Sequence, residues 1–174
     1  MKYPILAVLA VSLLAVVSDA QETPQADAAL EYAHYQILKG FTIPMDGASG
    51  SLAFHANRWF GVVGDAGVYL SHGGTNLTAE TYALGPRFSY CKFGRLVPFA
   101  EVLVGGTHFS GPVGGVSGGD GHHFTFGFGG GGDIVLGPRF ALRGEVEYFG
   151  WQATGATINN IRLSGGVVYR FGKR

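Results

Sequence analysis

Apolar side chains recur at every second position in segments spread along most of this chain. In residues 161–171 the odd positions are apolar, with Gly165 filling one of them, and the even positions carry Arg, Ser, Gly and Val. Successive residues of a β-strand point to opposite faces, so this pattern predicts a strand with one apolar and one polar face. Similar segments lie at 50–57, 61–70, 82–90, 97–108, 124–134 and 140–148. A first strand is expected at 29–38, where the facing is ambiguous because Tyr32 and Tyr35 differ in parity.

The connections between these eight expected strands are predicted to alternate between long and short. The long connections are expected at 39–49, 71–80, 109–122 and 150–159, and the short ones at 58–59, 91–96 and 136–138. Long external loops and tight periplasmic turns around an even number of strands are typical of outer-membrane barrels. The sequence therefore predicts an all-β, eight-stranded antiparallel up-and-down transmembrane barrel. Pro86 falls inside one of its strands and lacks an N–H group, so it breaks one hydrogen bond of the ladder, which a local bulge would accommodate.

The apolar faces of the strands carry most of the aromatic rings. The interior of an eight-stranded barrel is just wide enough for side chains to fill it, so these rings would overfill the lumen of a soluble barrel. Charged residues make up 14% of the chain, against about 25% in an average soluble domain. The apolar face is therefore predicted to contact lipid, with two aromatic belts at its edges and Phe109 and Trp151 in the belt near the long loops. The rings assigned to this face are Phe54, Tyr82, Phe88, Tyr90, Phe124, Phe126, Phe128, Phe140, Tyr148, Tyr169 and Phe171.

The opposite face combines small residues with acidic and basic side chains. Isolated charges would be strongly desolvated inside a narrow barrel, so they are expected to pair across strands. Glu145 and Glu147 are expected within reach of Arg162 and Arg170 on the last strand. We predict an ion-pair network that plugs the lumen, with a charged pore lining as the alternative. Its predicted members are Glu31, Asp65, Arg87, Glu101, Asp133, Arg143, Glu145, Glu147, Arg162 and Arg170.

The first twenty residues have the pattern of an export signal. Lys2 precedes a 13-residue apolar run at 5–17, and small residues stand at positions 18 and 20. The run is shorter than the roughly 20 residues of a spanning helix and fits a cleaved signal peptide. We expect a signal peptide at 1–20, a short periplasmic segment at 21–28 and the barrel domain at 29–174. The predicted location is the outer membrane of a Gram-negative-type bacterium.

No combination of side chains in the sequence predicts a catalytic, cofactor or metal site. His72, His108, His122 and His123 fall in or near the expected external loops, where scattered histidines are usually solvated. Ser110 with His108 would need a converging carboxylate for nucleophilic catalysis. The glycines at 127, 129 and 132 match G-x-G-x-x-G, but no helix follows to bind a dinucleotide. A net charge of zero argues against nucleic-acid binding, and a single cysteine excludes an internal disulfide.

Several segments resemble the small outer-membrane β-barrel family, which includes the transmembrane domain of outer membrane protein A. The segments that carry the resemblance are 59–65, 85–90, 98–100 and 160–172. The resemblance implies insertion by the outer-membrane barrel assembly machinery, with Tyr169 and Phe171 as the C-terminal insertion signal. Outer-membrane lipid and lipopolysaccharide are the implied surroundings, and a monomer is expected. The resemblance implies no catalytic residue. The expected function is a non-enzymatic envelope-structural or surface-interaction role through the extracellular loops; the alternatives are a narrow porin-like channel and a lipid-modifying barrel enzyme.

Overall fold

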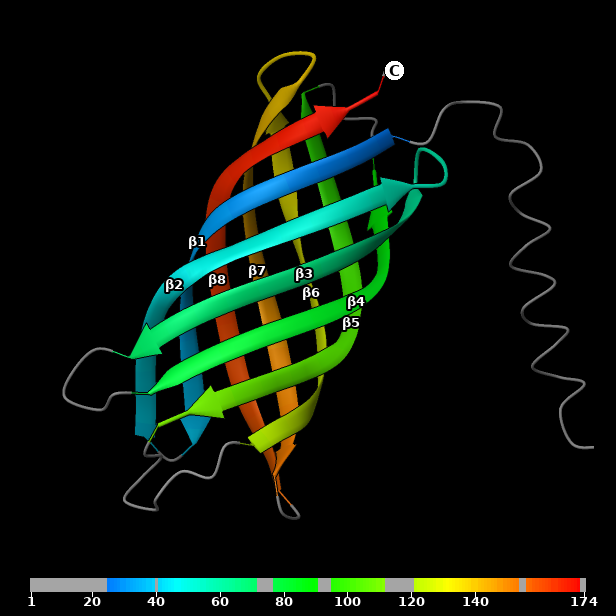
Figure 1. Ribbon diagram of the computed structural model, residues 1–174. Helices are drawn as coiled ribbons and strands as arrows, with labels where there is room; N and C mark the ends of the chain where they lie inside the picture. The colour runs from blue at the N-terminus through cyan, green and yellow to red at the C-terminus, as the bar shows by residue number, and fades with distance from the viewer. Residues whose placement is uncertain are drawn as a thin grey trace, which may run out of the picture.

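Eight antiparallel strands form a closed barrel, as predicted (Figure 1). The computed structural model describes residues 25–39, 41–71, 77–90, 95–111, 121–153 and 156–172. Each strand pairs with the next along the chain, and the last pairs with the first. The strands are β1 (Gln25–Lys39), β2 (Phe41–His55), β3 (Phe60–Ser71), β4 (Thr78–Ser89), β5 (Leu96–Ser110), β6 (Gly121–Val135), β7 (Phe140–Ala153) and β8 (Ala156–Phe171).

The seam between β1 and β8 closes the barrel. Pairing runs without interruption from Ala26 opposite Phe171 to Leu38 opposite Asn159. In lipid, every backbone N–H and C=O group needs a partner within the protein, and a closed sheet leaves no edge unpaired. Over the residues described, no helix has the length and apolar character needed to cross a membrane.

The strands are longer than predicted, which makes the predicted alternation of connection lengths wrong. β1 begins at Gln25, four residues before the expected start at Ala29. Residue 40 alone separates β1 from β2, and residues 154–155 alone separate β7 from β8. Segments rich in turn-forming residues continue as strand here because the neighbouring strand extends equally far and pairs with their backbone. The pairing at Gln36 opposite Pro44 and at Trp151 opposite Ile158 illustrates this.

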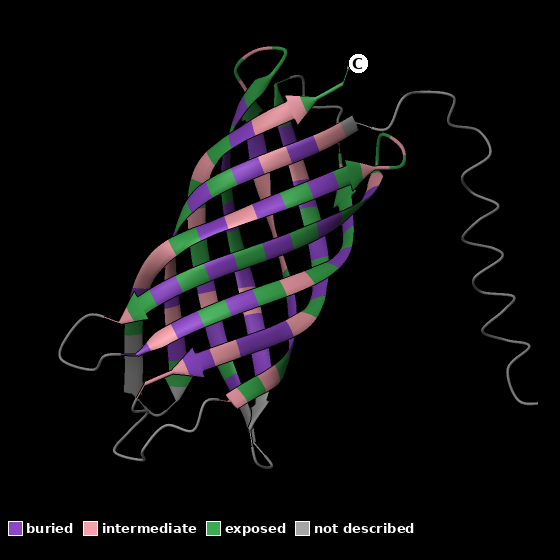
Figure 2. Cartoon of the chain, in the orientation of Figure 1, coloured by how far each residue is buried: buried purple, intermediate pink, exposed green. Residues whose placement is uncertain are grey.

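The two faces of the sheet follow the predicted alternation. Buried and exposed residues alternate along most strands (Figure 2). Leu30, Phe54 and Phe124 are 71%, 60% and 61% exposed to the outside of the barrel. All eleven rings assigned to the lipid face are exposed or half-buried, which confirms the outward apolar face. In β1 the structure settles the ambiguity, because Tyr32 points outward and Tyr35 is fully buried inside.

The strand accommodates Pro86 without a bulge. Leu84 pairs with Val104, and Arg87 pairs with Glu101 in the same register. The ladder between β4 and β5 is therefore interrupted at Pro86 without an inserted residue. A Cβ atom on Gly85 would lie 1.8 Å from the Val102 carbonyl oxygen, so the close approach of the two strands requires glycine there.

The first strand begins and the last strand ends at the same end of the barrel. The start of β1, the end of β8, the turns at 56–59 and 136–139, the end of β4 and the start of β5 lie together at the upper end in Figure 1. In bacterial outer-membrane barrels this is the periplasmic end. Two aromatic clusters mark it: Trp59 and Phe60 pack against Phe88, and Phe140 and Phe171 pack against Tyr169.

The predicted outer belt at the opposite end is wrong for Phe109 and Trp151. Both rings point into the lumen, where they are 6% and 7% exposed and lie 4.8 Å apart between centroids. Their positions in β5 and β7 have the inward parity of Glu101 and Glu147. Parity in the strand therefore outweighs the general preference of aromatic rings for the membrane interface.

Candidate functional site

The barrel interior is the candidate functional site, and the structure turns all ten predicted charged residues into it. Nine of them are buried, and Arg170 at the periplasmic mouth is half-buried. The buried members are Glu31, Asp65, Arg87, Glu101, Asp133, Arg143, Glu145, Glu147 and Arg162. The strands place them there because each occupies an inward position of the period-two alternation.

Arg162 on β8 is the centre of the group of ionic contacts that lies farther from the periplasmic end. Its Nη1 atom lies 2.7 Å from Asp65 Oδ1 and donates a hydrogen bond of 2.8 Å to the Tyr69 hydroxyl, both on β3. Its Nε atom donates to Glu147 on β7, and its Nη2 atom lies 3.5 Å from Glu145. Because β1 and β2 separate β8 from β3 in the wall, these contacts cross the lumen.

Arg143 on β7 forms a second centre nearer the periplasmic end. It donates two parallel hydrogen bonds to Asp133 on β6, of 2.7 Å and 2.9 Å. This two-pronged geometry is the strongest arrangement of guanidinium and carboxylate. Its Nη1 atom also reaches Ser51 on β2 at 3.2 Å, and Glu31 on β1 lies 3.8 Å from its Nε atom. These contacts join β7 to the opposite wall.

Arg87 on β4 forms a third centre through Glu101 and Phe99, both on β5. Its Nε atom donates a 2.6 Å hydrogen bond to Glu101. The guanidinium groups of Arg87 and Arg143 lie 4.4 Å and 4.8 Å from the centroid of the Phe99 ring. Cations over a ring face are attracted by its quadrupole, so Phe99 links two of the arginine centres.

Arg170 does not join Glu145 or Glu147, and this part of the sequence prediction is wrong. Its Nε atom lies 3.5 Å from Asp27 on β1, and Asp27 also contacts His55 on β2 at 2.7 Å. Glu147 lies opposite Arg162 and Glu145 opposite Ser164, so neither reaches the end of β8. The prediction omitted Asp27 because it began the first strand after this residue.

The extracellular half of the lumen is filled by aromatic and aliphatic side chains that the sequence prediction did not include. Tyr35 and Tyr69 stack at 4.8 Å with an interplanar angle of 17°, and Phe149 packs against Tyr35. Trp151 contacts Phe109 and His123. The inward parity of these residues is the signal that could have found them. They belong to a buried cluster that continues to Ala53 and Val63 in the periplasmic half. Its members are Ala33, Tyr35, Ile37, Met45, Ala53, Val63, Tyr69, Leu77, Ala79, Leu103, Phe109, Phe149, Trp151 and Ile158.

The histidines near the extracellular end do not assemble a catalytic or metal site in the described residues. Ser110 Oγ lies 3.2 Å from His108 Nε2. Glu80 is the cross-strand neighbour of His108, but His108 Nδ1 has no hydrogen-bond partner among the described residues. A Ser-His-carboxylate triad needs that bond to orient the imidazole. Within the described ranges no three His, Cys, Asp or Glu side chains lie close enough to hold a metal ion, and His72 falls outside them.

The end of β8 carries Tyr169 and Phe171 on the lipid-facing side. We expect the double substitution Tyr169→Asp and Phe171→Asp to reduce the amount of folded protein in the outer membrane strongly. The change removes two rings from the Phe140 cluster and places charges on the lipid face. Quantitative blotting of outer-membrane fractions, with heat-modifiable gel mobility as the folding readout, measures the effect. The pair Tyr169→Phe and Phe171→Tyr keeps two rings and is the matched control; unchanged levels of the double aspartate variant would contradict the assignment.

Comparison with known proteins agrees with this geometry. The model of the outer membrane protein beta-barrel domain matches residues 4–171. The chain belongs to this outer-membrane β-barrel family. The chain matches no curated protein in sequence.

Solved structures share the fold at low sequence identity. Neisserial surface protein A superposes with a TM-score of 0.73 at 14% identity, covering 84% of this chain and 97% of that protein. The outer membrane protein OprG from Pseudomonas aeruginosa gives 0.63 at 11% identity, with 88% and 98% covered. Ail, the attachment invasion locus protein of Yersinia pestis, gives 0.58 at 16% identity, with 85% and 99% covered. At such identities the likeness shows a shared outer-membrane barrel fold.

Proposed function

We propose that this protein is a non-enzymatic, closed barrel of the outer membrane that contributes to envelope structure or presents its extracellular loops to partners. The observation that carries the proposal is the side-chain bridge from Arg162 on β8 to Asp65 and Tyr69 on β3. A pore of this strand number has room for little more than its own inward side chains. A bridge across the lumen therefore occupies the path that a solute would take.

The ionic contacts and the apolar cluster inside the barrel support the same conclusion. Charged side chains bridge the periplasmic half and the middle, where Arg87, Arg143 and Arg162 are at most 4% exposed. Aromatic side chains around Tyr35 and Tyr69 pack together in the extracellular half. A water-filled channel would leave its lining exposed, so the narrow-porin alternative is not favoured.

The surroundings of the barrel belong to the same proposal. The outward apolar surface fits outer-membrane lipid, with lipopolysaccharide against the extracellular half. We also propose that the protein is exported through its signal peptide, is inserted by the barrel assembly machinery and is a monomer. The absence of a His108 Nδ1 partner in the described residues argues against the lipid-modifying enzyme.

Electrical recording of the purified, refolded protein in planar bilayers tests the proposal. We expect no steady open-channel conductance, because cross-lumen contacts block the path. An open porin reconstituted in the same way is the control for incorporation. A steady, large conductance of the unmodified protein would reject the closed barrel and favour the diffusion channel. The envelope role is tested separately, in a strain that lacks the protein. Increased detergent sensitivity of that strain would support it.

A further inference from the structure

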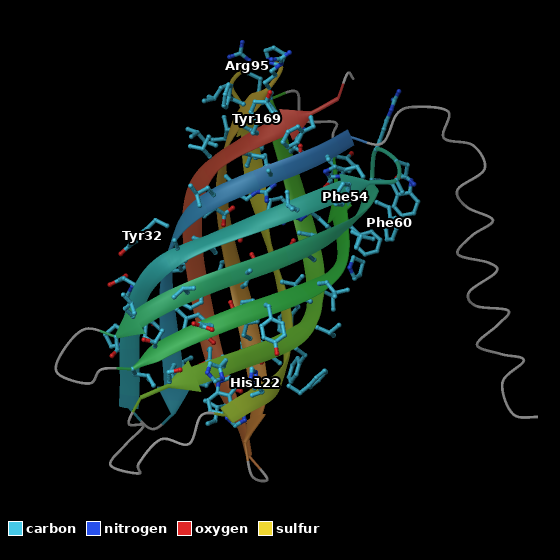
Figure 3. The ribbon with its side chains drawn as sticks, in the orientation of Figure 1. Tyr32, Phe54, Phe60, Arg95, His122 and Tyr169 are labelled. Carbon is cyan, nitrogen blue, oxygen red and sulfur yellow. The ribbon has the colours of Figure 1, made fainter. Side chains whose placement is uncertain are left out.

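An exposed arginine stands near the start of β3, β5 and β7 at the periplasmic end of the barrel. Arg58 lies in the turn at 56–59, Arg95 directly precedes β5 and Arg139 directly precedes β7, and all three are exposed. Each is followed directly by an outward apolar residue: Trp59, Leu96 or Phe140. Because the turns alternate around the wall, the three cations are distributed over the periplasmic rim. Figure 3 shows Arg95 at this end of the barrel and His122 at the opposite end.

Among the described residues, the exposed charges of this rim are arginines. The acidic side chains near this end, Asp27 and Asp133, are buried in the lumen, Asp27 against His55 and Arg170 and Asp133 against Arg143. The carboxylates that are exposed or half-buried in the described chain, Glu80 and Asp46, lie toward the extracellular end. The periplasmic rim therefore presents positive charge without exposed negative charge in the described chain.

Hydrogen bonds hold the backbone beside these arginines. The Asn57 side chain accepts hydrogen bonds from the backbone N–H groups of Trp59 and Phe60, at 2.9 Å and 2.8 Å. The Arg95 carbonyl accepts from the N–H of Val135, and the Arg139 carbonyl accepts from the N–H of Arg170, both at 2.8 Å. A fixed backbone lowers the entropy lost when a side chain binds a ligand.

The neighbouring rings place the arginines at the depth of lipid head groups. Trp59 is 54% exposed and stacks with Phe88, and Phe140 packs against Tyr169. Aromatic belts of this kind lie at the level of the head groups. A guanidinium one residue beyond the belt is then beside the phosphate groups, to which it can donate two parallel hydrogen bonds.

We propose that Arg58, Arg95 and Arg139 form a binding surface for the phosphate groups of anionic phospholipids in the periplasmic leaflet. The lipid is favoured over a soluble acidic partner because each arginine adjoins an outward apolar residue that contacts acyl chains. Binding at these three points fixes how deeply the barrel lies in the membrane. This inference depends on the membrane-embedded fold and not on the closed lumen.

The two tryptophans of the chain make the test direct. Trp59 adjoins Arg58 at the rim, whereas Trp151 is buried in the lumen. In a Trp151→Phe background, quenching of Trp59 fluorescence by brominated lipids reports the lipid bound beside Arg58. Vesicles containing brominated phosphatidylglycerol with plain phosphatidylcholine are compared with vesicles in which the bromine is on phosphatidylcholine instead. We expect a preference for phosphatidylglycerol of roughly fivefold, the size that one basic residue gives near an anionic surface.

Matched variants separate the site from general effects. Arg58→Gln in the same background should bring the preference close to one, and 1 M salt should reduce it in the parent because exposed charges are screened. Glu80→Gln is the control: it also removes one exposed charge, but toward the extracellular end of the barrel, and it should leave the preference unchanged. Equal quenching by the two brominated lipids in the parent, or an unchanged preference in Arg58→Gln, would overturn the proposal. Neither result would bear on whether the barrel conducts.

Discussion

Replacing Arg162 with methionine is expected to lower the free energy of unfolding of the barrel by roughly 3–5 kcal/mol, as when one partner of a buried ion pair is removed. Arg162 is fully buried and contacts carboxylates on two strands, Asp65 on β3 and Glu147 on β7. Methionine has a similar length, so it keeps much of the volume but leaves both carboxylates buried without their cation. Urea unfolding in lipid vesicles, followed by tryptophan fluorescence, measures the change.

Two further variants make this prediction specific. Arg170→Met removes an arginine from the half-buried periplasmic mouth, where its contact with Asp27 is 3.5 Å, and should cost only about 1 kcal/mol or less. Adding Glu147→Gln to Arg162→Met should recover part of the lost stability, because it removes one of the unpaired charges. Equal losses for Arg162→Met and Arg170→Met would show that the cross-lumen contacts do not stabilise the barrel.

A charge introduced in the middle of the lipid face is expected to cause the second large loss of stability. Leu163 at the middle of β8 is 51% exposed on the outside of the barrel, opposite Val146 on β7, which is also exposed. We expect Leu163→Arg to destabilise the inserted barrel by about 2–4 kcal/mol, the range for a basic side chain near the bilayer midplane. The same unfolding assay in vesicles measures it.

Pro138→Arg supplies the matched control for this charge. Pro138 is exposed in the periplasmic turn at 136–139, where an added arginine meets head groups and water. This variant should be nearly as stable as the parent. If Leu163→Arg were equally well tolerated, the outward face of β8 would not be in contact with hydrocarbon, and the assigned orientation of the sheet would be wrong.

Local patterns predicted the strands and their faces, but not where pairing stops. Alternation with a period of two depends only on neighbouring residues, so the outward position of Phe54 and the inward position of Glu101 follow from the sequence. The ends of β2 and β8 depend on how far their partner strands continue. Turn-forming residues around Pro44 and Asn159 indicated loops, yet a neighbouring backbone was present for them to pair with.

The charged residues that line the interior were predicted from the sequence, but the pairs that they form were not. The ten charged residues have inward parity in the sequence, and Tyr69 and Phe149 share that parity with Asp65 and Glu147. The prediction omitted these rings because it treated aromatic residues as lipid-facing. Parity within each strand would have been the better guide.

By itself, the sequence determines that this chain forms strands with an apolar outer face and a polar inner face, because both properties follow from side-chain direction along a single strand. The tertiary structure alone decides which inward residues meet. Asp65 and Arg162 are 97 residues apart and come together only because the barrel closes between β1 and β8 and brings the wall of β3 across from β8. Closure likewise gives Arg170 its partner Asp27, since the first and last strands become neighbours only when no edge is left free.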